Sequence, residues 1–214
     1  MRNIPDAAQK VARSACFISE PATLKGRWRE HLQVDGPLHV EIGSGKGRFI
    51  TTLAHQQPGT AFVAIERFTS VLVQLVKRIP DEGLTNLAVV NIDARALTEC
   101  FEPGEIDRIY LNFSDPWPKS RHENRRLTFR SFLDLYRIVL SQDGEVHFKT
   151  DNKGLFDYSL ESFPAAGWQL DHVTRDLHAE LPPEGNVMTE YEEKFSAMGH
   201  PIHRLTARPD RKDA

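Results

Sequence analysis

The chain has 214 residues, of which 40% are hydrophobic, so it holds enough apolar material for one sizeable α/β domain with extensions. Its formal charge of −3, from 27 Lys and Arg against 30 Asp and Glu, excludes a globally basic nucleic-acid-binding protein. The basic residues are nevertheless clustered, because residues 117–130 hold five Lys or Arg against one acid and residues 1–30 hold six against three. Two basic segments in an acidic protein indicate local attraction of a polyanion.

The two cysteines and the N-terminus indicate where the protein works. Cys16 and Cys100 are far apart and share no metal-ligand or redox spacing, so we expect reduced thiols and no metal site. The N-terminal segment has scattered charges and no apolar core of signal-peptide length, and no apolar run approaches the roughly 18 residues of a membrane span. We therefore predict a cytoplasmic protein without a membrane partner, either a monomer or a homodimer.

The chain is predicted to consist of an extension, residues 1–35, and one domain, residues 36–214. The extension has helical potential near residues 28–32, and we expect a mobile or loosely docked arm. From residue 38 onward, strand patterns alternate with amphipathic helical patterns, which predicts a parallel sheet with helices on both faces. After a first strand, turn and helix in residues 38–49, the strands are 61–65, 87–92, 106–113 and 145–149, and the helices are 69–79, ended by Pro80, 128–140 and 155–163. Residues 168–177 and 193–205 are predicted as a closing strand pair.

The stretch LHVEIGSGKGRF, residues 38–49, indicates the start of a nucleotide-binding α/β domain. Gly43, Gly45 and Gly47 allow a sharp turn and a close approach of ligand to backbone. Their spacing differs from the dinucleotide pattern G-x-G-x-x-G, and Glu41 precedes them. A carboxylate there would repel a pyrophosphate but suits the cationic amino-acid end of S-adenosylmethionine (SAM). The alternative is an ordinary glycine-rich turn beside a solvated glutamate.

Four acids follow four successive predicted strands: Glu41, Glu66, Asp93 and Asp115. Ligands bind outside the carboxyl ends of an open parallel sheet, where the strand order reverses, so the four acids are predicted to share one site. Glu66 lies 23 residues after Gly43, a suitable place for a carboxylate that accepts both ribose hydroxyls. Asp93 is placed to accept from the adenine amino group. Each acid alone could instead be a helix cap or a loop acid.

The segment SDPWPKSRHENRR, residues 114–126, carries the densest chemical signal. Pro116 and Pro118 stiffen the exit from the fourth strand and fix Trp117 between them. A rigid carboxylate and an aromatic ring beside a cofactor can hold a planar base by hydrogen bonding and stacking. A cationic run suited to phosphates follows, comprising Lys119, Arg121, His122, Arg125 and Arg126. A solvated helix start is the alternative for this run.

Six motifs in this order, VEIGSGKGRF, AIER, NIDA, NFSDPWPKSRHENRR, FKTDN and TEYEEKF, resemble the bacterial tRNA (guanine-N7)-methyltransferases from about residue 38 to residue 204. The string DPWPK-x-RH-x-x-RR is specific to that family. The resemblance implies a Rossmann-like class I SAM-dependent methyltransferase fold, with a mostly parallel seven-stranded sheet and helices on both faces. It also implies SAM as cofactor, tRNA as partner, and methylation of a variable-loop guanosine at N7.

The resemblance assigns roles by position. It implies SAM binding by Glu41, Gly43, Gly45, Glu66, Asp93 and Asp115, with Asp115 also the catalytic candidate. It implies substrate binding by Lys119, Asp151, Thr189, Glu190, Tyr191 and Glu192, and RNA contact by Arg121, His122, Arg125 and Arg126. Glu123 and Asn124 depart from the family, where lysine is common, which affects the expected RNA affinity and not the activity.

The chemistry of N7 fits these residues. N7 of guanine carries an in-plane lone pair and no proton, so alignment with the methyl donor matters more than a strong base. A carboxylate near the ring, Asp115 or Asp151, can stabilise the positive charge that develops on guanine. Acids in TEYEEKF, residues 189–195, can accept from guanine N1 and the exocyclic amine, although this segment could equally begin a strand. For Asp151 the alternative is an Asx turn that opens the next helix.

Three other classes remain at this stage. A SAM-dependent enzyme that acts on a small molecule or a protein would share the four acids but would not need the basic run. A nicotinamide dehydrogenase disagrees with the glycine spacing. A non-catalytic RNA-binding module would leave the four acids without a purpose.

Overall fold

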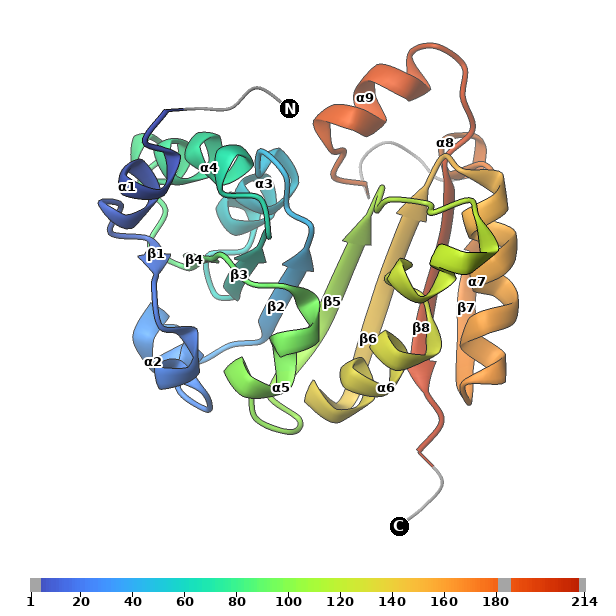
Figure 1. Cartoon of the computed structure of the whole chain (residues 1–214), viewed down its shortest axis with the longest axis horizontal. Helices are drawn as coiled ribbons and strands as arrows, with labels where there is room; N and C mark the ends of the chain where they lie inside the picture. Colours follow the sequence, from blue (N-terminus) through green and yellow to red (C-terminus); the bar gives the residue numbers. More distant parts are fainter. Residues whose placement is uncertain (1–4, 181–185, 212–214) are drawn as a thin grey trace.

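A computed structural model describes residues 5–180 and 186–211 of the chain. Its centre is an eight-stranded mixed sheet in the order β1-β4-β3-β2-β5-β6-β8-β7 (Figure 1). The strands are β1 (Phe17–Ile18), β2 (Leu38–Ile42), β3 (Ala61–Ile65), β4 (Leu87–Val90), β5 (Ile106–Asn112), β6 (Leu140–Thr150), β7 (Trp168–Thr174) and β8 (His203–Pro209). Six of them, β1 to β6, pair in parallel, and β8 is antiparallel to both of its neighbours, β6 and β7.

The strand order reverses between β2 and β5. From β2 the chain proceeds outward to β3 and β4, and it then returns to place β5 on the other side of β2. Every residue of β2, β3 and β4 is buried, as expected for strands covered on both faces. The reversal leaves an opening above the carboxyl ends of β2 and β5, which is where open α/β sheets bind ligands.

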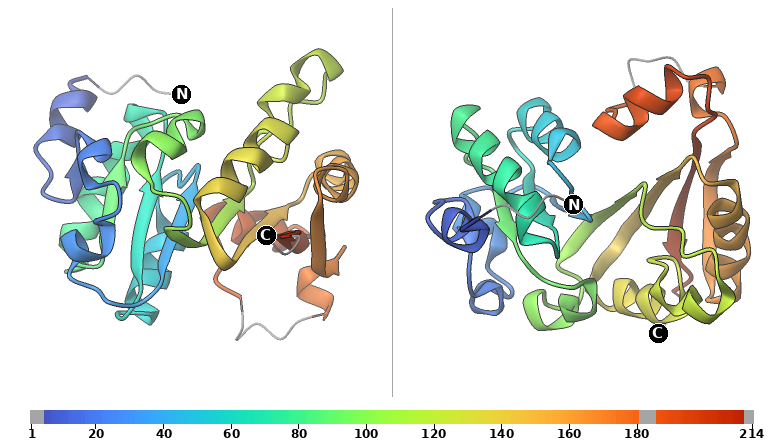
Figure 2. Two further views of the ribbon diagram at one scale, coloured as in Figure 1. Left: turned by 90° about the horizontal axis from the view of Figure 1, so that it is seen from below. Right: turned by 45° about the horizontal axis from the view of Figure 1, so that its top comes forward.

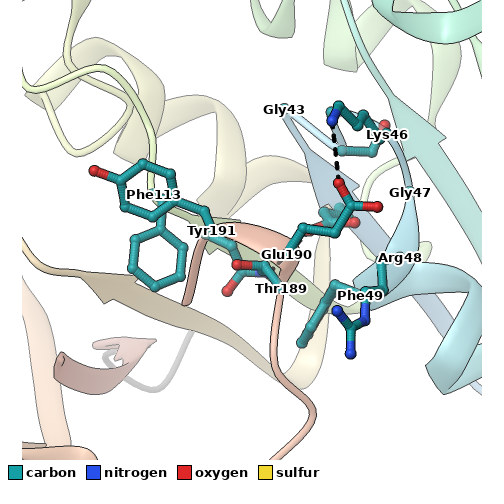
Figure 3. A pocket seen from close by; sticks show the side chains of 13 residues that line it. Gly43, Lys46, Gly47, Arg48, Phe49, Phe113, Thr189, Glu190 and Tyr191 are labelled. Carbon is teal, nitrogen blue, oxygen red and sulfur yellow. Dashed lines mark hydrogen bonds and ion pairs between the residues drawn. The ribbon is translucent and has the colours of Figure 1, made fainter. Parts of the chain in front are cut away.

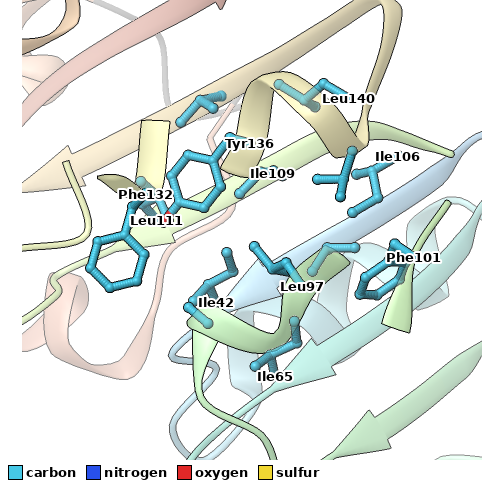
Figure 4. Packing of buried hydrophobic residues seen from close by; sticks show 14 of the residues in the cluster. Ile42, Ile65, Leu97, Phe101, Ile106, Ile109, Leu111, Phe132, Tyr136 and Leu140 are labelled. Atoms are coloured by element: carbon cyan, nitrogen blue, oxygen red, sulfur yellow. The ribbon is translucent and has the colours of Figure 1, made fainter. Parts of the chain in front are cut away.

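Helices cover the two faces of the sheet and form two hydrophobic clusters. One cluster joins the sheet to α2 (Trp28–Leu32), α5 (Leu97–Cys100), α6 (Arg130–Val139) and α7 (Lys153–Ala165), and Figure 4 shows α5 and α6 packed over β5. The other joins it to α1 (Ala7–Ala12), α3 (Arg48–Gln56) and α4 (Thr69–Asp81). Two further helices, α8 (Leu177–Glu180) and α9 (Glu190–Ser196), precede β8, and 3₁₀ turns occupy Pro21–Leu24, Ala94–Ala96 and Ser120–Arg125.

The N-terminal segment differs from the expected loosely docked arm. Phe17 and Ile18 pair in parallel with β4 and so add the eighth strand to the predicted seven. The indole of Trp28 is fully buried and donates to the carbonyl oxygen of Cys100 at 2.9 Å. Val11 on α1 is buried against α4. Apolar side chains therefore dock residues 5–35 onto the domain, whereas a domain boundary at residue 35 stays a prediction.

Two other predictions need correction. Residues 193–205 were expected to form a strand, but α9 occupies Glu190–Ser196 and β8 begins only at His203. A capping box between Thr189 and Glu192 starts this helix, a local signal stronger than the short apolar alternation. Helix α4 also continues through Pro80 to Asp81, since a proline in the last turn removes few helical hydrogen bonds.

The described residues also bear on membranes and metals. Within residues 5–180 and 186–211, no helix is long and apolar enough to cross a membrane. In the same part of the chain, no group of three or more His, Cys, Asp or Glu side chains could hold a metal ion. Cys16 and Cys100 are both free thiols.

Candidate active site

Two adjacent cavities open at the carboxyl ends of β2 and β5. The larger, about 530 Å³, is lined from the ends of β2, β3, β4 and β5, and the smaller, about 370 Å³, lies between the glycine turn and the start of α9. Both are lined by Gly43, Gly45, Asn112 and Phe113. Seen with the carboxyl ends brought forward, α3 and α9 stand on either side of this region (Figure 2). The cavities therefore meet at the strand-order reversal.

Backbone hydrogen bonds fix the glycine turn between β2 and α3. The amides of Gly43 and Ser44 both donate to the carbonyl oxygen of Ile65, at 2.8 and 3.0 Å. At Gly43 and Gly45, φ is positive, and a Cβ would meet nothing within 4 Å, so both backbones face open space. Gly47 also has a positive φ, but a Cβ there would lie 2.1 Å from Leu75 Cδ1 on α4. The first two glycines thus leave room for a ligand, whereas the third lines the smaller cavity and also makes room for Leu75.

Glu41 is a buried acid with one unsatisfied oxygen. Asn112 Nδ2 donates to Glu41 Oε1 at 2.9 Å, while Glu41 Oε2 has no hydrogen-bond partner among the described residues. Burial raises the pKa of Glu41 to about 8, against the opposing influence of Asn112 and Lys149. An unpaired buried carboxylate oxygen beside a cavity is costly, and a cationic ligand would compensate it.

The next two acids line the larger cavity in different ways. Glu66 is buried at the end of β3, where its carboxylate accepts from the amides of Gly45 at 3.2 Å and Phe68 at 2.9 Å. Asp93 caps the turn after β4, accepts from the Arg95 amide at 3.0 Å, and is half-exposed. The backbone therefore orients Glu66, while Asp93 remains accessible at the rim.

The loop after β5 has an unusual backbone. Phe113 and Trp117 have φ values of 52° and 41°, in the left-handed region that bulky residues rarely adopt. Between them, Asp115 is exposed and lines the larger cavity together with Ser114 and Trp117. The structure thus places the catalytic candidate at the mouth of the cavity and not among the buried acids.

The predicted RNA-contacting run divides into two kinds of residue. Lys119, Arg121 and Arg125 are exposed, and the Arg125 guanidinium lies 4.7 Å from the centre of the Trp117 ring. The His122 ring stands perpendicular to the same indole, with the two ring centroids 5.9 Å apart. Arg126 instead points inward and donates to the carbonyl oxygens of the preceding loop. Only part of the run is therefore presented to a ligand in solution.

Helix α9 is anchored to the sheet through Glu192. This side chain is fully buried, and it receives hydrogen bonds from Lys149 Nζ and Asn186 Nδ2, both at 2.6 Å. His178 Nε2 lies 3.3 Å away. Burial lowers the pKa of Lys149, and the Glu192 carboxylate acts in the opposite direction. Glu192 was predicted to bind substrate, but its carboxylate already forms an internal ion pair with Lys149.

The first two residues of α9 and its N-cap line the smaller cavity. Glu190 lies 3.4 Å from Lys46 Nζ and 3.1 Å from Arg78 Nη2, and Figure 3 shows the Lys46 pair across the cavity. Tyr191 lies beside Phe113, with ring centroids 5.0 Å apart, and its hydroxyl donates to Asp151 Oδ2 at 3.2 Å. Thr189, Glu190 and Tyr191 all line this cavity. The structure thus brings Asp151 and the start of α9 together.

Comparisons with known proteins decide the family. A family model described as "Putative methyltransferase" matches residues 35–205. A tRNA (guanine-N(7)-)-methyltransferase from Bacillus velezensis is 52% identical over 214 residues, which cover 100% of this chain and 98% of that protein. The Bacillus subtilis protein of the same name is 52% identical over 205 residues, 95% of this chain and 96% of its own length. The chain belongs to the tRNA (guanine-N(7)-)-methyltransferase family.

Solved structures support the fold of this family. A 16S rRNA methyltransferase, KamB, matches with a TM-score of 0.65 at 14% identity, over 85% of this chain and 91% of that chain. An antibiotic-related methyltransferase matches with a TM-score of 0.61 at 19% identity, over 83% and 89%. At such low identity the likeness concerns the fold alone, and it confirms the predicted Rossmann-like class I methyltransferase architecture.

Sequence reasoning missed several residues of this family member's site. Asn112, which donates to Glu41, lies within the predicted strand 106–113, which assigned it no role in the site. Lys149 lies in the motif FKTDN, which does not predict its ion pair with Glu192. A lysine within an otherwise buried strand was the available signal, because such a charge needs a buried partner.

Proposed function

We propose that this protein transfers a methyl group from SAM to N7 of a guanosine in tRNA. The observation that carries the proposal is the buried Glu41 carboxylate, whose unpaired oxygen faces a cavity beside the glycine turn. The relatives' names supply the acceptor, since tRNA (guanine-N(7)-)-methyltransferases at 52% identity match almost the whole chain. Because tRNA is the substrate, we also propose that the protein works in the cytoplasm.

The residues present fit SAM. Glu41 would hold the ammonium group of the methionine end, Glu66 the ribose hydroxyls and Asp93 the adenine amino group. Gly43 and Gly45, where a Cβ would project into open space, line both cavities and leave room for a ligand that passes from one to the other. When bound, SAM supplies an electrophilic methyl group on a positively charged sulfur. The protein's own task is to orient both reactants and to exclude water from between them.

The guanine site is proposed beside the junction of the two cavities. Phe113 and Tyr191 offer aromatic faces there, and the Tyr191 hydroxyl orients the Asp151 carboxylate. Asp151 is therefore better placed to accept hydrogen bonds from guanine N1 and the exocyclic amine than Glu192, which is paired with Lys149. Of the acids in TEYEEKF, Glu190 also lines the cavity, but it is paired with Lys46 and Arg78.

The chain's contribution to the chemical step is electrostatic. N7 has a free lone pair, so no residue needs to remove a proton before the methyl group arrives. Guanine becomes cationic during the transfer, and a carboxylate on the mouth of the cavity would stabilise it. We assign this role to Asp115, which the loop after β5 exposes to the larger cavity.

The exposed basic residues after this loop would hold the tRNA backbone. Arg125 lines the larger cavity, and Lys119 and Arg121 are exposed on the segment that leads to it, so all three would reach phosphates. Phosphate contacts fix the register of a nucleic acid and carry no sequence information. The pocket beside Phe113 and Tyr191 would therefore recognise guanine, and the exposed basic residues would supply the affinity for tRNA.

Nucleoside analysis tests the proposal directly. Unmodified bulk tRNA is incubated with the protein and SAM carrying a labelled methyl group, and the digested nucleosides are separated. The label should appear in 7-methylguanosine. Incorporation into a different nucleoside, or into small molecules or protein with none in tRNA, would overturn the proposal. A parallel reaction on tRNA that already carries 7-methylguanosine should incorporate no label.

A further inference from the structure

Arg126 behaves unlike the other arginines of the basic run. Its Nε donates to the carbonyl oxygens of Pro116 at 3.2 Å and Trp117 at 3.3 Å, and its Nη2 donates to Trp117 at 3.1 Å. The guanidinium also lies 4.2 Å from the centre of the Tyr158 ring, on α7. Its donors are thus directed at the protein, whereas Arg121 and Arg125 are exposed.

Apart from the contacts that Arg125 and His122 make with the Trp117 ring, little else holds the shape of the loop that Arg126 contacts. Within the described part of the chain, residues 114–118 make no backbone–backbone hydrogen bond. Pro116 and Pro118 have no amide hydrogen to donate. Trp117, between them, is held at a φ of 41°, a conformation that a bulky residue keeps only when its surroundings impose it. The planar fork of an arginine suits this task, because it can bond adjacent carbonyl oxygens in one fixed geometry.

Arg126 itself rests on a firm base. Two residues further on, Thr128 is fully buried and tied to α7: Ser159 Oγ donates to Thr128 Oγ1 at 2.9 Å, and Ser162 Oγ donates to the Thr128 carbonyl at 2.7 Å. With the Tyr158 ring on the same helix, these contacts connect α7 through Arg126 to the loop that carries Asp115.

We propose that Arg126 is a positioning residue, which holds the carbonyl groups of Pro116 and Trp117 and thereby fixes Asp115 at the mouth of the cavity. It does not bind RNA phosphate. Within one short basic run, Arg121 and Arg125 serve tRNA binding and Arg126 serves the geometry of the reaction. This inference rests on the proposed methyl transfer for its kinetic consequence, but the loop contact stands on its own.

Steady-state kinetics separate the two roles. Arg126→Ala should lower kcat roughly 10- to 100-fold, the effect of displacing a reacting group by about an ångström, with the tRNA KM and its salt dependence near the parent values. Arg126→Lys should also be slow, because one ammonium group cannot reproduce the fork. Arg121→Ala should show the opposite split, a raised tRNA KM with a parental kcat, because Arg121 is exposed, whereas the Arg125 guanidinium lies over the Trp117 ring of the loop itself. Arg130→Ala, an exposed residue paired with Asp134 on α6, is the matched control and should match the parent.

Tryptophan fluorescence gives a readout that needs no activity. The chain has three tryptophans, of which Trp28 and Trp168 are 0% and 2% exposed, so quenching by acrylamide reports mainly on Trp117. Both Arg126 variants should be quenched more strongly than the parent and Arg130→Ala, with SAM affinity and thermal unfolding as checks of the fold. If Arg126→Ala does not fold, Arg126→Lys decides.

Parental quenching and kcat in the folded Arg126 variants, or a raised tRNA KM with a shallower salt slope, would overturn the inference. Failure of the methylation proposal is distinguishable, because the parent protein would then not methylate tRNA while the quenching difference persisted.

Discussion

The two halves of the site are built by different means. On the cofactor side, backbone amides fix the glycine turn to β3 and orient Glu66. On the substrate side, side chains do this work: Arg126 holds the loop after β5, and the Lys149–Glu192 pair holds α9. Most single substitutions in the half proposed for the cofactor should therefore leave its backbone shape intact and remove only one ligand contact. The substrate half should lose its geometry when one supporting side chain changes.

The largest effect is expected from Glu192→Gln. This change leaves the Lys149 ammonium buried without a carboxylate and should destabilise the protein by about 3 kcal/mol. Chemical denaturation measures the loss. Glu193→Gln on the same helix is the matched control, because Glu193 pairs with Arg48 at the surface and its loss should leave the unfolding midpoint unchanged. Equal stability in the two variants would contradict the anchoring role of Glu192.

On the cofactor side, Glu66→Ala should weaken SAM binding by about 1–3 kcal/mol. The variant loses the acceptor of the ribose hydroxyls and leaves the amides of Gly45 and Phe68 without their partner. Calorimetry measures the affinity, with the exposed Glu161→Ala on α7 as control. Unchanged affinity in a folded Glu66→Ala protein would remove this residue from the cofactor site.

The pKa of Glu41 predicts a dependence on pH. Burial raises this pKa to about 8 from the ordinary value near 4.5, so the unfolded chain releases the proton first as the pH rises. The resulting stability is fully present below pH 4.5 and is lost between pH 4.5 and 8. Glu41→Gln should abolish this loss and be more stable than the parent at pH 8. Identical pH profiles of the unfolding free energy would refute the assignment.

The same residue should link pH to cofactor affinity. Since ionised Glu41 is the form that attracts an ammonium group, the parent should bind SAM more tightly at pH 7.5 than at pH 6, a range in which the ammonium group of the ligand stays largely protonated. Calorimetry in buffers of different ionisation enthalpy should detect proton release near pH 7. Glu41→Gln should show neither effect. The Glu41→Gln variant should therefore be more stable than the parent but bind SAM more weakly, as expected where a binding site keeps an uncompensated charge.

The smallest effect concerns the exposed part of the basic run. The double variant Arg121→Ala, Arg125→Ala should raise the tRNA KM and flatten the slope of log affinity against log salt by about 1.5, through the loss of two phosphate contacts. Its affinity for SAM should match that of the parent. A parental salt slope would show that these arginines form only a solvated surface.

The sequence allowed much of the cofactor half to be predicted, because its signals are local. Apolar runs predicted β2 to β5 closely, and β3 at the same bounds, since buried parallel strands have continuous hydrophobic patterns. The acids at their ends indicated a site at this edge of the sheet, where Glu66, Asp93 and Asp115 line the larger cavity and Glu41 lines the smaller one. The glycine turn was predictable because the residues that form it are neighbours in the sequence. The role of these residues in SAM binding stays a prediction.

The substrate half was predicted less well because its contacts are distant in sequence. The ion pair between Lys149 and Glu192 spans 43 residues, and α9 hides it within a segment that also resembles a strand. Charge alone did not distinguish Arg126 from Arg125, since only the fold shows which guanidinium points inward. The pairing of Phe17 and Ile18 with β4 was missed because two residues are too short for a strand pattern.

The most direct test of the account is single-turnover methylation by Asp115→Asn at saturating SAM and tRNA. The asparagine keeps the size of the side chain, and Arg126, Pro116 and Pro118 limit rearrangement of the loop. If Asp115 stabilises cationic guanine, the rate should fall roughly 10- to 100-fold while SAM affinity, measured separately, stays near the parent value. A parental rate at saturation, with weakened SAM binding, would assign Asp115 to the cofactor half and contradict the placement of the chemistry in this loop.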